Sequence, residues 1–160
     1  MALDERAKRD ALRMLPHPVF IVGCSLENNY HLFVGTWLTQ VSFRPPLVGF
    51  GCRKESGSHE MIRKSGVFSI NILDKTQKDV AAAFLKGAAF KGKTVNGLGF
   101  NVNGSGAPLL DDAMAVLECR VVQEAEGGDH RVFVGEIIHA ETRRQAPCLT
   151  LDDIGLQYGG

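Results

Sequence analysis

Hydrophobic residues recur at helical spacing near the start of the chain. Leu3, Ala7 and Ala11 follow this spacing, and charged residues fill most of the positions between them. The pattern predicts an amphipathic helix within residues 1–15. Pro16 ends it, because proline lacks the amide hydrogen that a continuing helix needs.

Further along, the pattern changes to short apolar runs of β type. Residues 19–24 are apolar on both faces, and a polar turn separates them from a second run at 31–38, so the two predict a hairpin. Two longer runs, 113–123 and 131–140, predict a second hairpin, joined at Gly127-Gly128-Asp129. Other strands are predicted at 47–52, at 67–73 and near 100–102.

Two short helices are predicted between these strands. Ser56 is placed to cap a helix over 59–64, which Gly66 ends. Asp74 and Gln77 form the pattern of a capping box for a helix over 78–86.

Two segments show little periodicity. Residues 86–106 are rich in glycine and are interpreted as a long functional loop with one short strand. The tail, 147–160, is expected to hold a short strand and to end loosely.

Consecutive strands therefore follow one another by hairpins, without regular helical crossovers. This order favours a barrel of antiparallel strands over a parallel α/β sheet. Neither repeats nor a linker divide the sequence, so we expect one domain over residues 1–160.

The composition excludes several classes of protein. Hydrophobic residues make up 44% and charged residues 22%, as in globular domains, and 18 basic residues balance 18 acidic ones. Without a basic excess, nucleic acid and anionic membranes are not expected partners. The mixed charge of the first residues and the absence of a long apolar run lead us to expect a cytoplasmic protein. The scattered cysteines are expected to be reduced, most of them buried: Cys24, Cys52, Cys119 and Cys148.

Residues 87–94 match the phosphate-binding expression GxxxxGK[ST] letter for letter. The mechanism of that motif requires a strand before it and a helix after it, whose first amides bind the phosphates. Here a predicted helix precedes the match and a glycine-rich stretch follows it. We therefore interpret it as a flexible basic loop. A Rossmann GxGxxG fingerprint and metal-ligand spacings are also missing from the sequence.

Two other stretches combine groups that suit a ligand. Residues 36–46 crowd polar and apolar side chains before a double proline, and residues 53–59 lead from a strand end with two cations into a helix start. A helix start beside Arg and Ser can bind an anion, although plain helix capping explains the same residues. On the strand 67–73, Ser69 and Asn71 point away from the apolar face and need partners from the protein or from a ligand.

Four segments resemble the flavin reductase family, and they occur in the family's order. They are VSFRPPLV (41–48), RKESGSHEMIRKSGVFSINIL (53–73), GAPLLDDAMAVLECRVV (106–122) and GDHRVFVGEI (128–137). The family includes the small reductase components of two-component flavin monooxygenases. The resemblance implies a mainly β, antiparallel Greek-key split barrel with a few short helices, which forms a homodimer with FMN near the subunit interface.

The resemblance also implies site residues. His130 falls where the nicotinamide of NAD(P)H stacks, and residues implied near the flavin ring, its ribityl chain and its phosphate are Thr36, Trp37, Leu38, Thr39, Gln40, Val41, Ser42, Arg53, Lys54, Ser56, Ser58, Asn71, Phe90 and Lys91. Trp37 replaces a usual small hydroxyl residue. Glu55 stands where a serine that contacts the phosphate is common, and an acid there is unfavourable unless it turns away.

The implied activity is hydride transfer from NAD(P)H to FMN, with FAD as an alternative flavin. Reduced flavin or electrons would then pass to a partner oxygenase or another redox protein. The alternative is an FMN-binding electron-transfer module with little NAD(P)H activity of its own.

Overall fold

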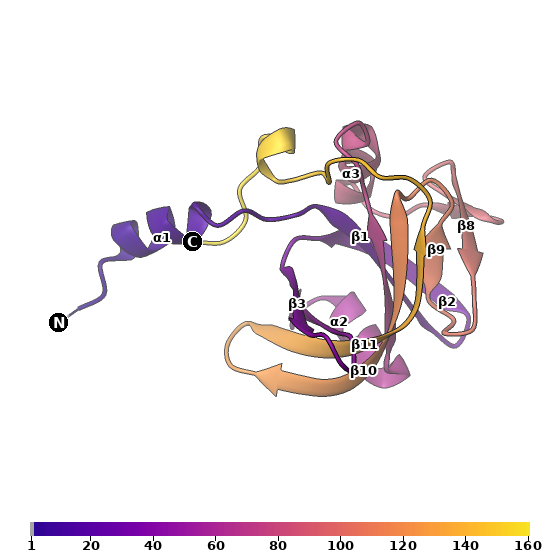
Figure 1. Ribbon diagram of the computed structural model, residues 1–160, viewed down its shortest axis with the longest axis horizontal. Helices are drawn as coiled ribbons and strands as arrows, with labels where there is room; N and C mark the ends of the chain where they lie inside the picture. Colours follow the sequence, from indigo (N-terminus) through magenta and orange to yellow (C-terminus); the bar gives the residue numbers. More distant parts are fainter. Residues whose placement is uncertain (1) are drawn as a thin grey trace.

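The computed structural model describes residues 2–160, and its main body is a curled antiparallel sheet (Figure 1). The strands of the large sheet are β1 (Phe20–Leu26), β2 (Asn29–Gly35), β3 (Leu38–Ser42), β4 (Leu47–Arg53), β5 (Val67–Ile72), β10 (Ala115–Glu126) and β11 (His130–Thr142). A smaller sheet holds β6 (Phe90–Lys91), β7 (Thr94–Val95), β8 (Leu98–Val102) and β9 (Pro108–Leu110). The helices are α1 (Glu5–Arg13), α2 (Gly57–Ser65), α3 (Lys78–Leu85) and the short 3-10 helix η1 (Asp152–Ile154).

The order of strands in the large sheet is β2-β1-β5-β10-β11-β4-β3, and each neighbouring pair is antiparallel. The mainly β, antiparallel fold predicted from the sequence is confirmed. β2 and β3 are consecutive in the chain but lie at opposite edges of the sheet. Only Thr36 and Trp37 connect them, so the sheet must curl until its two edges come close together.

Strand β1 is buried on both faces, which explains why residues 19–24 are apolar throughout. One face of β1 contributes Phe20 and Val22 to the barrel interior, together with Phe50, Phe68 and Phe133 from other strands. The opposite face contributes to a second core, which the small sheet, α3 and the C-terminal segment cover.

Helix α2 closes the interior of the barrel. Ser56 caps it by accepting a hydrogen bond from the amide of His59, and Gly66 ends it in the left-handed conformation at φ 70°, as predicted. Ile62 is fully buried among the interior side chains. Burial of such a side chain contributes about 1.5–3 kcal/mol, which anchors the helix and fixes where it begins.

The capping box predicted for α3 is only half correct. The Gln77 side chain accepts from the amide of Asp74, but Asp74 accepts from the amide of Thr76 instead of capping the helix. Gln77 is the residue that precedes the helix, and its side chain makes no capping bond.

Residues 86–106 are not the long loop that was predicted. They form three of the strands of the small sheet, two of which are only two residues long. Such short strands carry no alternating pattern, so the sequence does not reveal them. The match to GxxxxGK[ST] lies in a β-hairpin after α3, without a helix behind it, and does not have the phosphate-binding geometry.

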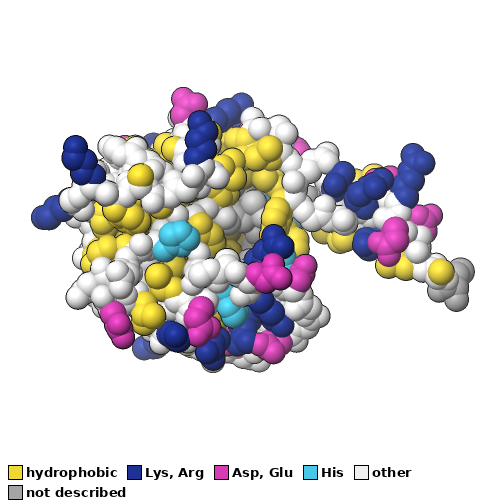
Figure 2. Space-filling model, turned by 180° about the vertical axis from the view of Figure 1, so that it is seen from behind, with side chains coloured by type: hydrophobic (Ala, Val, Ile, Leu, Met, Phe, Trp, Pro, Cys, Tyr) yellow, Lys and Arg dark blue, Asp and Glu magenta, His cyan; other side chains and the backbone are white. Residues whose placement is uncertain are grey.

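Helix α1 projects from the barrel, and the C-terminal end of the chain lies beside it (Figure 1). Asp4 caps the helix, as its side chain accepts from the amides of Arg6 and Ala7. None of residues 5–13 is buried, so the apolar side of this amphipathic helix stays largely exposed in the part of the chain that the structure describes. Figure 2 shows hydrophobic side chains exposed both on α1 and on the body. Residue 1 of the predicted helix lies outside the described residues.

All four cysteines are free thiols, and three of them are buried as predicted, whereas Cys148 is exposed. Within residues 2–160, the helices are too short or too polar to cross a membrane.

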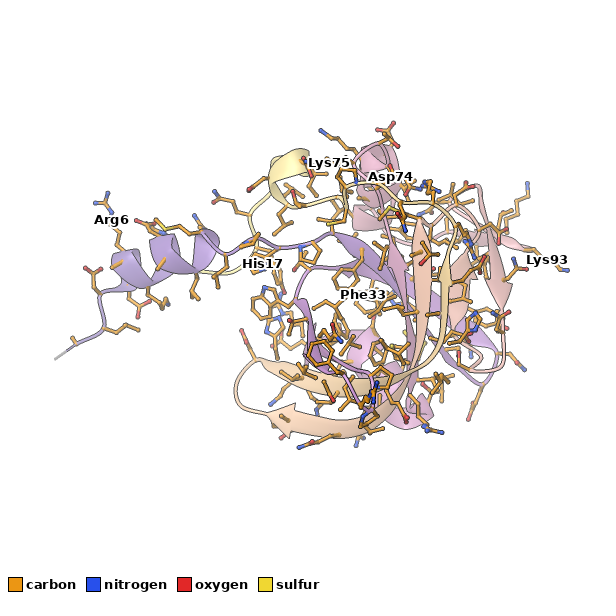
Figure 3. All side chains as sticks on the ribbon, viewed as in Figure 1. Arg6, His17, Phe33, Asp74, Lys75 and Lys93 are labelled. Atoms are coloured by element: carbon orange, nitrogen blue, oxygen red, sulfur yellow. The ribbon has the colours of Figure 1, made fainter. Side chains whose placement is uncertain are left out.

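An ion pair ties the C-terminal segment to the end of β5. Arg144 contacts the buried carboxylate of Asp74 at 2.7 Å (Nε) and 2.6 Å (Nη2), and Asp74 is labelled in Figure 3. The hydrogen bond from the Thr76 hydroxyl, aided by Arg144, holds the pKa of Asp74 below its usual value. A depressed carboxyl pKa contributes stability that is present above the unfolded pKa and is lost as the pH falls through the folded pKa.

We expect Arg144→Gln to lower the free energy of unfolding by about 1–3 kcal/mol at pH 7, because it leaves a buried carboxylate without its cation. The loss should shrink as the pH falls below about 3.9, the usual aspartate pKa, and through the lower pKa of Asp74 in the folded protein. Urea denaturation at pH 7 and pH 3 measures both effects. Arg120→Gln, which breaks the more exposed pair with Glu136, is the control and should cost about 0–1 kcal/mol. Equal losses for the two variants would contradict the assignment.

Candidate functional site

The connection between the two edge strands carries the largest aromatic side chain of the chain. The carbonyl oxygen of Trp37 accepts a hydrogen bond from the amide of Gly51 at 2.9 Å. A Cβ atom at Gly51 would lie 3.2 Å from the Trp37 ring, closer than an ordinary contact. The glycine therefore lets the indole lie directly on β4.

An apolar cavity of about 500 Å³ opens beside this indole. Its walls come from the end of α1 and the linker after it, from the β2–β3 connection, from β3, β4 and β11, and from the end of the chain. Five residues predicted for the flavin site line it: Thr36, Trp37, Leu38, Thr39 and Val41.

A narrower slot of about 250 Å³ lies on the other side of the same connection. Phe33, labelled in Figure 3, and Phe50 give it apolar walls, while Arg53 and Ser56 form a polar end. Thr36 lines both cavities, so the connection separates them. An apolar slot that ends in a cation and a helix start suits a flat ring with an attached anionic group.

The polar end of the slot is built by the turn between β4 and α2. Ser56 donates to the carbonyl oxygen of Arg53 at 2.8 Å and so fixes the turn. Of the four residues predicted to hold a phosphate, Arg53 and Ser56 line the slot. Lys54 lines neither cavity, and Ser58 is buried, with its hydroxyl 2.7 Å from Nδ1 of His31.

Glu55 does not turn away from the polar end. Its carboxylate lies 3.3 Å from the Arg53 guanidinium, and both side chains are largely exposed to solvent. The cation that suits a phosphate is thus already paired with an acid. An arriving anion has to compete with this carboxylate.

His130 begins β11 directly opposite Arg53 in the antiparallel register. Its ring centroid lies 4.4 Å from that of Trp37, and its Nδ1 atom lies 2.7 Å from Oδ1 of Asp129. The hydrogen bond with His130 holds the pKa of Asp129 below its usual value, so the carboxylate is ionised and accepts the bond. Nδ1 of the imidazole is therefore the donor in this hydrogen bond.

The structure does not bring every predicted residue to this place. Asn71 is fully buried: its amide nitrogen donates to the carbonyl oxygen of Ile21, and its oxygen accepts from the amide of Leu110. Ser69 is likewise buried and donates to the carbonyl oxygen of Pro108. The protein itself satisfies these polar groups, and Asn71 lines neither cavity, so its contact with a ligand stays a prediction.

Four further predicted residues lie outside both cavities. Gln40 and Ser42 are on β3, where the Gln40 side chain donates to the carbonyl oxygen of Ser42. Phe90 and Lys91 form β6 on the small sheet, away from the slot-lining residues.

Cys52 lines the slot as a buried free thiol. Burial raises the pKa of its thiol, and the same cause raises the pKa of Cys24 to about 12. A protonated thiol in an apolar wall acts as a small hydrophobic group.

The C-terminal segment, which no pattern in the sequence singles out, forms one side of the slot. Leu156, Gln157 and Tyr158 line it opposite the barrel wall. The one available signal was Tyr158, a lone aromatic residue in the tail 147–160.

Comparison with known proteins gives consistent results. Residues 12–158 match the family model described as flavin reductase like domain. The chain is 31% identical over 158 residues to a probable flavin reductase of Rhizobium meliloti, covering 98% of this chain and 48% of the relative. It is also 31% identical to the FMN reductase (NADH) SmoA of Agrobacterium fabrum, covering 90% of this chain and 80% of the relative.

Solved structures agree with these matches. Nitrilotriacetate monooxygenase component B from Mycobacterium thermoresistibile superposes with a TM-score of 0.79 at 30% identity, covering 92% of this chain and 82% of that one. The predicted split-barrel fold class is confirmed. The chain spans about half the length of some curated relatives and most of the length of others.

We expect Glu55→Gln to bind FMN about two- to fivefold more tightly than the unmodified chain, because it frees Arg53 and removes a negative charge beside the phosphate position. Titration of FMN against the fluorescence of Trp37, the single tryptophan, measures the affinity. Glu136→Gln removes an equal charge outside both cavities and is the control. Unchanged or weaker binding by Glu55→Gln would contradict a competing role for this carboxylate.

Proposed function

The chain belongs to the flavin reductase like domain family, and from this premise we propose that it is an oxidoreductase that binds FMN and transfers hydride from NAD(P)H to flavin. One observation carries the proposal. A single slot joins apolar walls to the Arg53 and Ser56 end, and His130 lies on the strand beside Arg53.

The residues of the slot fit a phosphorylated flat ring. Phe33 and Phe50 offer apolar surface to the ring, and Arg53 with the start of α2 offers positive charge to the phosphate. Thr36 and Trp37, at the junction of the two cavities, are placed to contact the middle of the ligand. Glu55 opposes phosphate binding, which favours a flavin that exchanges over one that is held permanently.

When bound, FMN supplies the redox chemistry by accepting hydride from the nicotinamide. The contribution of the protein is to hold two flat rings about 3–3.5 Å apart and to keep water out. His130 is placed to orient the nicotinamide, since its ring packs against Trp37, and Trp37 lines the larger, apolar cavity. The missing Rossmann motif is compatible with a nicotinamide that binds against the flavin.

The purified protein with added FMN should oxidise NADH or NADPH faster than free flavin does. We expect His130→Ala to lower turnover more than it lowers FMN affinity, because it removes a group that orients the second substrate. Steady-state absorbance at saturating FMN measures the turnover, and the Trp37 titration measures the affinity.

Two outcomes would contradict the proposal. A rate no higher than that of free flavin, with FMN bound, would indicate an electron-transfer module with little NAD(P)H activity. Absence of FMN and FAD binding would exclude both functions.

We further propose that the protein acts as a homodimer in the cytoplasm and supplies reduced flavin to a partner oxygenase. The exposed apolar side of α1 supports the dimer, as do Val41 and Phe43 on or beside β3, which are 51% and 86% exposed. The similarity to nitrilotriacetate monooxygenase component B supports the proposal of a partner oxygenase.

Sedimentation equilibrium should give twice the 17.4 kDa mass of the chain. Phe43→Glu should shift the equilibrium towards the monomer, because it places a charge on the exposed apolar surface. Val102→Glu introduces the same charge on the small sheet, away from this surface, and should not change the mass. A monomer in the unmodified protein would refute the dimer.

A further inference from the structure

The last residues of the chain pack against the proposed site. Leu156, Gln157 and Tyr158 form one side of the slot, and Gly159 and Gly160 line the larger cavity. Tyr158 also lines both cavities, so its side chain stands on the boundary between the proposed flavin position and the apolar space beside it.

The Tyr158 hydroxyl lies 2.9 Å from Nε2 of His130. In the tautomer whose Nδ1–H donates a hydrogen bond to the Asp129 carboxylate, Nε2 has a free lone pair and accepts from the tyrosine hydroxyl. Asp129, His130 and Tyr158 thus form a chain of hydrogen bonds that fixes both the tautomer and the plane of the imidazole.

Trp37 completes the packing around this chain. Its ring centroid lies 4.4 Å from that of His130 and 5.2 Å from that of Tyr158. Gly159 follows the tyrosine with φ at 93°, and a Cβ atom there would lie 3.2 Å from the indole. The glycine allows the backbone of the tail to approach the indole closely enough to hold Tyr158 over His130.

We propose that Tyr158 is a positioning residue for the reductase reaction, holding the His130 imidazole in the orientation that receives the nicotinamide. The inference rests on the proposed function, in which His130 orients the second substrate. Without the hydroxyl, the imidazole can change tautomer and rotate, and fewer encounters with NAD(P)H are productive. FMN affinity depends on the Arg53 end of the slot and should not change.

Tyr158→Phe tests the proposal, because it removes the hydroxyl and keeps the ring against Trp37. We expect kcat/KM for NADH to fall about five- to tenfold at saturating FMN, with an unchanged Kd for FMN. Tyr30→Phe is the matched control, since Tyr30 is the one other tyrosine and packs on Phe100 in the second core. It should leave the kinetics unchanged.

A double-mutant cycle separates positioning from general packing. If Tyr158 acts through His130, then adding Tyr158→Phe to His130→Ala should produce no further loss. The ¹⁵N shifts of the His130 ring give a readout without turnover. They should indicate a protonated Nδ1 in the unmodified protein and a mixture of tautomers in Tyr158→Phe. In the Tyr30→Phe control, Nδ1 of His130 should remain protonated as in the unmodified protein.

The outcomes separate the two proposals. An unmodified protein that does not oxidise NADH overturns the proposed function, and the role of Tyr158 in it falls as well. An active protein whose Tyr158→Phe variant has normal kinetics, or loses the same factor in the His130→Ala background, overturns the role of Tyr158 alone.

Discussion

The two-residue connection from β2 to β3 is the constraint that shapes this molecule. These strands are the opposite edges of a seven-stranded sheet, yet Gly35 and Leu38 are separated by only three peptide units. Three units span at most about 11 Å, so the sheet has to curl into a barrel that remains split at this point. The cavities on either side of Thr36 and Trp37 follow from this split. A flat sheet with the same strand order would not have them.

The register of the sheet then places the chemical groups. β4 ends at Arg53 and β11 begins at His130, and the two residues are direct partners on neighbouring strands. Strands in a sheet lie about 4.8 Å apart, so a cation and an imidazole are fixed at one end of the barrel by backbone hydrogen bonds. Helix α2 begins four residues after Arg53 and is anchored by Ile62 in the interior. Its first turn therefore remains beside the slot.

The sequence predicts the parts of the fold that depend on neighbouring residues. Ser56 and Gly66 identify both ends of α2, and the turn residues identify the two hairpins, because caps and turns act over a few positions. Asn71 could not be assigned in this way. Its partners, Ile21 and Leu110, are distant in the chain, so the sequence shows a polar residue that needs a partner without showing which one. Tyr158 was missed for the same reason, since it meets His130 across 28 positions.

The closeness of the C-terminal end to Trp37 has a practical consequence for any fusion of this chain. Gly159 packs on the indole of Trp37, and the Arg13 side chain of α1 donates a hydrogen bond to the carbonyl oxygen of Gly159. A domain or affinity tag joined after Gly160 would emerge at the mouth of the larger cavity and not on a remote surface. An electron acceptor attached there would be tethered within reach of the site, whereas a bulky tag would obstruct entry.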